Sequence, residues 1–171
     1  SMKILEALTE VSIEYVRNQA KHGIECFQLF ETYSGLIPEQ MYIEKILPLS
    51  KKILNEARNN GLPTIFFPKG LGNGLSYITK DVCDFLSVDW QMNLNHARKI
   101  ISRDIGIQGN IDPRILYSSY NDIEVYLSTL KSFGEKNNNW IINLGHGFLP
   151  DIDYKKAKFV VEWIKETNWK R

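Results

Sequence analysis

The segment WIINLGHG, Trp140–Gly147, carries the pattern from which the fold is inferred. It begins with an almost entirely apolar run, typical of a strand that is buried on both faces. His146 follows, between Gly145 and Gly147. Glycines at such a point indicate a sharp exit from the strand or a close approach of two backbone segments. Taken alone, His146 fits a loop tip as well as a functional site.

Apolar runs of strand length alternate with helical patterns along the rest of the chain. The first helical pattern contains Leu5–Val16, and Gly23 is its expected stop signal. Strands are expected at Ile24–Glu31, Pro63–Phe67, Phe85–Trp90, Gly106–Asp112 and Trp140–Leu144. Further helices are expected at Pro38–Asn60 with a kink or break at Pro48, at Ser76–Cys83, from about Asn95, at Asp122–Lys136, and at Tyr154–Asn168 with Asp153 as its cap.

Strands that are separated by helices predict right-handed crossovers and a parallel sheet, so the fold class is α/β. Two architectures fit this order: a doubly wound open sheet or part of an eight-stranded barrel. A dinucleotide-binding fold would carry G-x-G-x-x-G after its first strand. Here GLGNG follows the second strand and ends at Ser76 instead of a matching glycine, which argues against that fold.

Polar side chains follow every expected strand at its carboxyl end. Parallel sheets and barrels both place their chemistry at this edge, so one shared site is expected there. Each residue also has a simpler explanation, such as a loop cap, a turn before Pro113 or a solvated lysine. The residues are Glu31, Thr32, Lys69, Asp89, Asn110, Asp112 and His146.

Composition excludes several classes of protein. The formal net charge is +1, which provides no basic surface for nucleic acid or an anionic membrane. An apolar share of 43% and a charged share of 24% are those of a globular domain, and no apolar run is long enough to span a membrane. Cys26 and Cys83 form neither a C-x-x-C motif nor a disulfide framework, so two buried, reduced thiols of a cytoplasmic protein are expected.

Five motifs resemble, in order and spacing, the C-terminal half of uroporphyrinogen decarboxylase. NLGHG with the following proline and aspartate is the most specific of them. The motifs are QLFETYSG (Gln28–Gly35), FPKG (Phe67–Gly70), SVDW (Ser87–Trp90), IQGNIDP (Ile107–Pro113) and NLGHGFLPD (Asn143–Asp151).

The resemblance implies a (β/α)8 TIM barrel, of which this chain supplies about strands 4–8 and their helices. Residues 1–171 are then the C-terminal portion of one barrel domain, and the family's N-terminal half, with its arginine-bearing segment, has no counterpart here. Members of the family are usually homodimers. They remove the four acetate carboxylates of uroporphyrinogen III to give coproporphyrinogen III in haem biosynthesis, with no metal or other cofactor.

The resemblance also implies roles for individual residues. His146 is expected to be catalytic and to face the substrate, with the flanking glycines letting the backbone approach a large flat macrocycle. Thr32 is expected to hydrogen-bond a substrate carboxylate, and Lys69 to attract one. Phe30 is expected to pack against the substrate ring, although a core phenylalanine on a buried strand explains it nearly as well.

Two other functions are alternatives to a decarboxylase. Zinc methyltransferases of the same superfamily carry His-x-Cys at the strand that matches TIFFPKG and a cysteine in place of His146, and this chain has neither. A non-catalytic half-barrel that serves as an interaction or regulatory module stays open as the alternative. In either case two apolar sheet edges predict a partner, which is the missing N-terminal half or a second copy of the chain.

Overall fold

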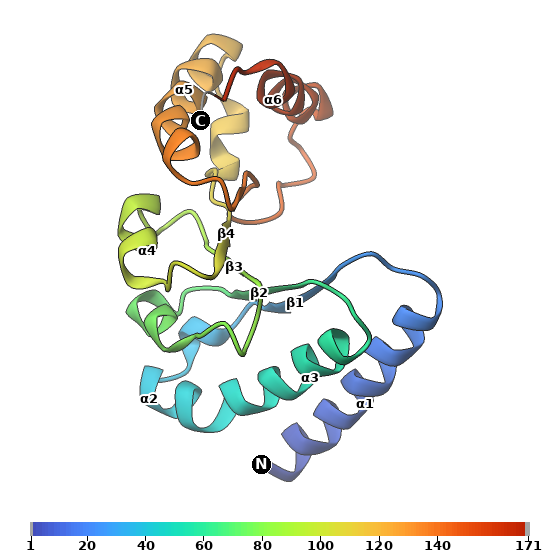
Figure 1. Ribbon diagram of the computed structural model, residues 1–171. Coiled ribbons are helices and arrows are strands. Elements are labelled where there is room, and N and C mark those ends of the chain that lie inside the picture. The colour runs from blue at the N-terminus through green and yellow to red at the C-terminus, as the bar shows by residue number, and fades with distance from the viewer. Residues whose placement is uncertain (1, 170–171) are drawn as a thin grey trace.

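The computed structural model describes residues 2–169, in which a five-stranded sheet forms the centre of the fold (Figure 1). All neighbouring strands are parallel, and their order in the sheet follows their order in the sequence. The α/β class and the parallel sheet are therefore confirmed. The strands are β1 (Phe27–Glu31), β2 (Thr64–Pro68), β3 (Phe85–Ser87), β4 (Gly106–Gln108) and β5 (Trp140–Ile141).

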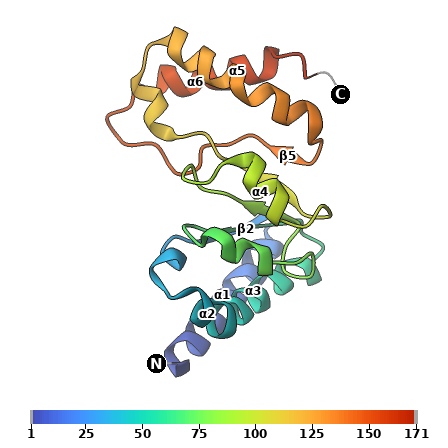
Figure 2. The same cartoon turned by 90° about the vertical axis from the view of Figure 1, so that its left-hand side faces the viewer.

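The helices that connect successive strands lie along one face of the sheet, as the two perpendicular views show (Figure 1, Figure 2). The α-helices are α1 (Met2–Lys21), α2 (Glu39–Met41), α3 (Leu47–Asn59), α4 (Leu94–Ile100), α5 (Tyr120–Lys136) and α6 (Tyr154–Glu166). Short 3₁₀ turns η1 (Ser34–Leu36), η3 (Gly72–Tyr77) and η4 (Pro113–Tyr117) follow β1, β2 and β4, and the π-helical turn η2 (Tyr42–Ile46) joins α2 to α3.

Helix ends coincide with residues that the sequence marks as stop or start signals. Gly23 and Gly61 adopt φ of 78° and 77° just after α1 and α3, a left-handed conformation that favours glycine. At the start of α4, the Asn93 side chain accepts hydrogen bonds from two backbone amides. Ser119 and Asp153 cap α5 and α6 in the same way.

The expected break at Pro48 is present, but the structure places it one turn earlier than the proline itself. Pro48 lies at the start of α3, where a missing backbone N–H does no harm. The preceding turn, η2, has π-helical hydrogen bonding. The single helix that a strict 3.6-residue period would give is thus divided into α2, η2 and α3.

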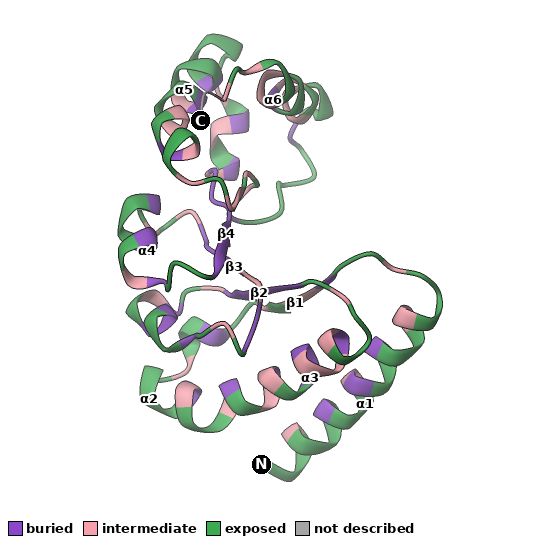
Figure 3. Cartoon of the chain, in the orientation of Figure 1, coloured by how far each residue is buried: buried purple, intermediate pink, exposed green. Residues whose placement is uncertain are grey.

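The main hydrophobic core lies between the sheet and the helices that cover it. In Figure 3 the buried residues concentrate on the strands and on the sheet-facing side of α3. Alternate strand residues point into this core, and α1 packs against α3 and contributes Ile13 and Val16 to the same core. The strand residues of this core are Phe27, Leu29, Phe66, Leu86, Val88, Ile107 and Trp140.

The opposite face of the sheet, here called the inner face, is buried in its middle and exposed at its edges. Ser87 and Gln108 are paired across β3 and β4, and the Gln108 amide donates to the Ser87 hydroxyl at 3.2 Å. On the same face the Phe85 ring lies over Gly106, where a Cβ would come within 2.2 Å of it. The inner face thus keeps its own packing across the central strands.

The two outer strands are less buried than the sequence predicts. Phe30 of β1 is 63% exposed and Ile141 of β5 is 38% exposed, although both were expected in strands buried on each face. Each of these strands has a pairing partner on one side only within residues 2–169. The apolar composition is therefore correct for a strand inside a larger sheet, and the exposure results from the open edge.

Two other expectations are wrong. No α-helix forms at Ser76–Cys83, where the 3₁₀ turn η3 ends at Tyr77 and is followed by a turn at residues 80–82. This segment contains three β-branched residues, and the Thr79 hydroxyl donates to the Asp81 carboxylate, a local bond that competes with helix formation. Cys26 is exposed because it precedes the edge strand, whereas Cys83 is buried as expected and burial raises its thiol pKa to about 12.

Within residues 2–169, no helix combines the length and the apolar character that crossing a membrane requires.

The core packing predicts a large difference between two leucines. Leu54 of α3 is fully buried, and Leu36 in η1 is 80% exposed. We expect Leu54→Ala to lower the free energy of unfolding by about 2–5 kcal/mol, because it removes buried methyl groups and leaves a cavity. Leu36→Ala, the matched control, should change it by less than about 0.5 kcal/mol. Urea denaturation followed by circular dichroism measures both, and equal losses would contradict the core described here.

Candidate functional site

All strands run in the same direction, so the loops that follow them, and the polar residues in those loops, lie along one edge of the sheet. Figure 1 shows the order of these strands. Loops after β2, β3, β4 and β5 contact one another at this carboxyl edge. The expectation of a shared edge is therefore correct, and the contacts below define which residues meet there.

Thr32 and Lys69 are neighbours on this edge. The ladder between β1 and β2 continues past their last paired residues, since the Lys69 amide donates to the Glu31 carbonyl oxygen at 3.1 Å. Thr32 therefore lies beside Lys69, on the inner face that also carries Phe30. The Ser34 hydroxyl donates to the Lys69 carbonyl oxygen at 2.7 Å and lies 3.0 Å from that of Glu31.

Phe30 lies below Thr32 on the inner face and packs against Phe67. Their rings meet edge to face with centroids 6.0 Å apart. One face of Phe30 is thus held by β2 while most of the ring stays accessible. Because this exposure follows from the open edge of β1, both explanations of Phe30, as a ligand contact and as a core residue of a larger sheet, remain predictions.

Asp89 fastens the loop after β3 to the loop after β2. It is 8% exposed, and its Oδ2 accepts from the Gly70 amide at 2.8 Å while Oδ1 accepts from the Gln91 amide at 2.9 Å. Both carboxylate oxygens are therefore engaged by backbone donors. Asp89 has the loop-capping role that its simpler explanation gave it.

Asn110 and Asp112 are also structural. The Asn110 amide donates to the carbonyl oxygens of Asp89 (2.8 Å) and Met92 (2.5 Å), which ties the loop after β4 to the loop after β3. Asp112 caps η4 and pairs with the Arg114 guanidinium, whose hydrogen bonds lower the pKa of the Asp112 carboxyl. The turn before Pro113 thus accounts for Asp112.

His146 is placed by Gly145. A Cβ on Gly145 would lie 2.3 Å from the Trp90 nitrogen, so the loop after β5 approaches the loop after β3 as closely as only glycine allows. The His146 side chain is exposed, and its Nδ1 lies 3.2 Å from the Gly147 carbonyl oxygen. A carbonyl oxygen only accepts, so Nδ1 is the donor in this contact.

Trp90 brings Lys69 and His146 together. The Lys69 ammonium lies over the Trp90 ring, 5.5 Å from its centroid, and the His146 imidazole meets the same indole at 86° with centroids 5.6 Å apart. Trp90 was not among the expected site residues. The only signal in the sequence was its place directly after the strand-end aspartate in SVDW.

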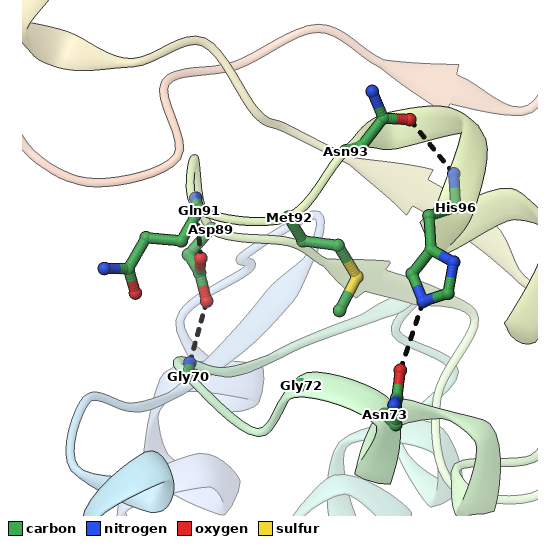
Figure 4. Close-up of a pocket in the computed structure, with 8 residues that line it drawn as sticks. All are labelled: Gly70, Gly72, Asn73, Asp89, Gln91, Met92, Asn93 and His96. Atoms are coloured by element: carbon green, nitrogen blue, oxygen red, sulfur yellow. Dashed lines mark hydrogen bonds between the residues drawn. The ribbon is translucent and has the colours of Figure 1, made fainter.

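A second feature that the sequence did not predict is a small cavity of about 290 Å³ between the loops after β2 and β3 (Figure 4). His96 projects into it from α4, and its Nε2 contacts the Asn73 side-chain oxygen at 3.1 Å. Asp89 and Gly70 form the wall that this cavity shares with the site. Neither Lys69 nor His146 lines it.

Glu31 ends β1 at the carboxyl edge, and its side chain lies on the face of the sheet that the helices cover. Its Oε1 accepts from the Ser50 hydroxyl of α3 at 2.6 Å, and burial raises the pKa of the Glu31 carboxyl. Tyr42 lies fully buried beside it, and burial together with the Glu31 charge raises the phenol pKa as well. Glu31 therefore anchors the end of β1 to α3 and does not face the inner surface.

Across residues 2–169, no three or more His, Cys, Asp or Glu side chains gather closely enough to hold a metal ion. At the end of β2, the side chains are those of phenylalanine, proline and lysine.

Solved structures share this arrangement of strands and helices. A methyltransferase from Methanosarcina mazei matches 92% of this chain and 47% of its own length, with a TM-score of 0.72 and 16% sequence identity. At that identity the likeness concerns the fold alone. It supports an α/β protein whose parallel sheet is part of a (β/α)8 barrel, with polar residues gathered at the carboxyl edge.

Sequence comparison narrows this class to one family. The family model for uroporphyrinogen decarboxylase (URO-D) matches residues 1–167. Proteins named uroporphyrinogen decarboxylase from Trichlorobacter lovleyi and Francisella tularensis subsp. novicida are 32% and 34% identical to it, each over 96% of this chain. The chain covers only 48% and 49% of these relatives. It belongs to the uroporphyrinogen decarboxylase family.

The close approach at Gly145 predicts different effects for the two glycines beside His146. A Cβ on Gly145 would collide with the Trp90 backbone, whereas a Cβ on Gly147 would meet no atom within 4 Å. We expect Gly145→Ala to lower the free energy of unfolding by about 1–3 kcal/mol and to shift the Trp90 amide resonance. Gly147→Ala should do neither. Indistinguishable variants in urea denaturation and NMR would contradict the packing of these two loops.

Proposed function

We propose that this chain supplies the C-terminal part of a uroporphyrinogen decarboxylase, which converts the four acetate side chains of uroporphyrinogen III to methyl groups without metal or other cofactor. The observation that carries the proposal is the meeting of Lys69 and His146 on the Trp90 ring, next to Thr32, at the carboxyl edge of a sheet whose sequence matches this family. Cations and a proton donor are what a polycarboxylate substrate requires at such an edge.

The chemistry demands a proton at two points. Protonation of a pyrrole ring carbon creates an electron sink, and the bond between the acetate methylene and its carboxylate then breaks with loss of CO₂. The bonding electrons enter the ring system, and a second proton converts the exocyclic methylene to a methyl group. The ring carbon then loses the first proton, which restores the aromatic pyrrole. The site therefore has to donate protons, hold carboxylates and stabilise positive charge on the ring.

His146 is assigned the proton transfer, because its Nδ1 is used in the contact with the Gly147 carbonyl oxygen and its Nε2 is left for a ligand. Thr32 and Lys69 are assigned to carboxylate binding, through a hydroxyl hydrogen bond and an ammonium charge. Phe30 offers an accessible aromatic surface on the same inner face, against which a pyrrole ring packs. The net charge of +1 leaves most cations for an octa-acidic substrate to the other half of the barrel.

The test of this function joins the N-terminal half of the Trichlorobacter lovleyi relative to this chain, in one polypeptide. We expect the chimera to release coproporphyrinogen from uroporphyrinogen, measured by chromatography of the oxidised porphyrins. His146→Ala should lower turnover by about 10²–10⁴-fold, the usual contribution of a positioned proton donor. His22→Ala, an exposed histidine beyond α1, should leave turnover unchanged.

Thr32→Val in the same chimera should raise KM more than it lowers kcat, because a hydrogen bond that positions the substrate is lost while the proton donor stays. We expect a rise in KM of about three- to ten-fold. Steady-state rates over a range of uroporphyrinogen concentrations measure this split. An unchanged KM and kcat would remove Thr32 from the site. An inactive wild-type chimera that folds would favour the non-catalytic module.

We also propose that the open edge at β1 takes up the N-terminal half of a barrel from this family. Val11 and Tyr15 form part of an exposed apolar stripe on α1, with Ile4 and Leu8 on the same helical face. A cavity of about 470 Å³ lies beside it, between α1 and β1. A parallel strand followed by a helix would cover both features at once, and the curated relatives contain about as much chain again as this one.

The stripe can be tested with two exposed valines. Val11 on α1 is 68% exposed and Val125 on α5 is 61% exposed. We expect Val11→Glu to weaken binding to a separately produced N-terminal half at least about ten-fold, since it would bury a charge, and Val125→Glu to leave binding unchanged. Sedimentation of the mixed halves measures the affinity. Self-association of this chain would instead identify a second copy as the occupant, and a stable 19.8 kDa monomer with no affinity for the half would refute the proposal.

A further inference from the structure

The backbone around Trp90 is held from several directions. The Asp89 carboxylate accepts from the Gln91 amide, which closes a turn around Trp90, and it accepts from the Gly70 amide in the neighbouring loop. Asn110 donates to the Asp89 carbonyl oxygen on the same turn. These hydrogen bonds restrict the backbone at Trp90 more than is usual for a loop residue.

The indole of Trp90 contacts side chains from two other strands. Lys69 enters from the end of β2 and places its ammonium over the ring. His146 enters from the loop after β5 and meets the ring almost perpendicularly. The half-buried Lys69 side chain and the exposed His146 side chain would each have several rotamers in water, and a shared aromatic surface restricts both of them.

Charge around the indole favours an anion. The nearest acidic group in the loop, Asp89, is 8% exposed and has both oxygens occupied by backbone amides. Its carboxylate therefore does not neutralise Lys69 by a direct ion pair. The ammonium of Lys69 and the Nε2 of His146 are the groups that this surface offers to a ligand.

We propose that Trp90 is a positioning residue, whose indole holds Lys69 and His146 as a pair that binds a carboxylate carried on a pyrrole ring. The inference rests on the proposed function for the identity of that ligand, but the positioning itself concerns only residues of this chain. A purely structural Trp90, packed to fill space, is the competing explanation. The two differ in what phenylalanine and leucine do at this position.

The first experiment observes the positioning without any enzyme activity. In NMR spectra of this chain, the ring current of the indole shifts the His146 imidazole protons away from those of exposed His22. We expect Trp90→Leu to abolish the shift and Trp90→Phe to retain part of it. A His146 spectrum that is the same in wild type and Trp90→Leu would overturn the proposal, whatever the chimera does.

The second experiment tests the ligand, with 1H-pyrrole-3-acetic acid as the probe and its methyl ester as the uncharged control. We expect the acid to shift the resonances of His146 and of the Lys69 side chain, and Trp90→Leu to weaken its binding about five-fold. Lys69→Met should weaken it similarly, while Lys99→Met on the exposed side of α4 should not. Equal binding of acid and ester would overturn the carboxylate assignment.

The third experiment uses the chimera to separate positioning from space-filling. We expect Trp90→Leu to lower kcat/KM about ten-fold and Trp90→Phe to stay within about three-fold of wild type. Trp90→Leu combined with Lys69→Met should be little worse than Trp90→Leu alone, because residues that act together are not additive. Strictly additive losses would overturn the pairing. A chimera that is inactive while the NMR shift behaves as expected would refute the proposed reaction and leave the positioning supported.

Discussion

The positions of the loops at the carboxyl edge depend on hydrogen bonds to the carboxylate of Asp89. It spans two backbone amides, Gly70 in the loop after β2 and Gln91 in its own loop, and both of its oxygens are used. Asn110 adds the loop after β4 through the Asp89 carbonyl oxygen, and Gly145 packs the loop after β5 against the same peptide. Loops from four strands therefore take their positions from one short segment. A buried carboxylate in this role is stabilised because its acceptors are fully satisfied.

The hydrogen bonds of Asp89 hold the exposed site in place although the sheet has open edges within residues 2–169. The central strands keep a packed inner face, with Phe85 over Gly106 and Gln108 bonded to Ser87, while the outer strands leave apolar side chains in solvent. A closed barrel has no such edges. The edges and the site are thus separate properties of the chain: the edges are the unpaired sides of β1 and β5 within residues 2–169, whereas the contacts among Lys69, Trp90 and His146 do not involve those sides.

Much of the fold follows from local signals in the sequence. Gly23 and Gly61 end helices because each adopts positive φ, and Asp153 begins one because its side chain accepts from a backbone amide. These effects depend on a few neighbouring residues and are visible in the sequence. Two features could not be predicted in this way. At Ser76–Cys83, a side-chain hydrogen bond competes with helix formation. Phe30 is exposed because β1 has a neighbouring strand on one side only within residues 2–169.

The candidate site likewise contains some residues that the sequence predicts and others that depend on contacts between distant parts of the chain. His146, Lys69 and Thr32 could be predicted because each follows a strand, and strand ends share an edge. The role of Trp90 could not, since it arises from contacts with residues more than twenty and more than fifty positions away along the chain. Asp89 and Asn110 have side chains suited to catalysis, yet their hydrogen bonds are all used in holding loops.

The hydrogen bonds that connect the loops at the carboxyl edge are mainly between side chains and main-chain atoms. Asp89 binds two amide nitrogens, Asn110 binds two carbonyl oxygens, and the Ser34 hydroxyl bonds to main-chain oxygen as well. Every residue carries a carbonyl oxygen and every residue except proline an amide N–H, so most loop side chains can change without loosening the framework. The fold itself does not require a particular set of loop side chains: this chain and a methyltransferase from Methanosarcina mazei share it at 16% sequence identity.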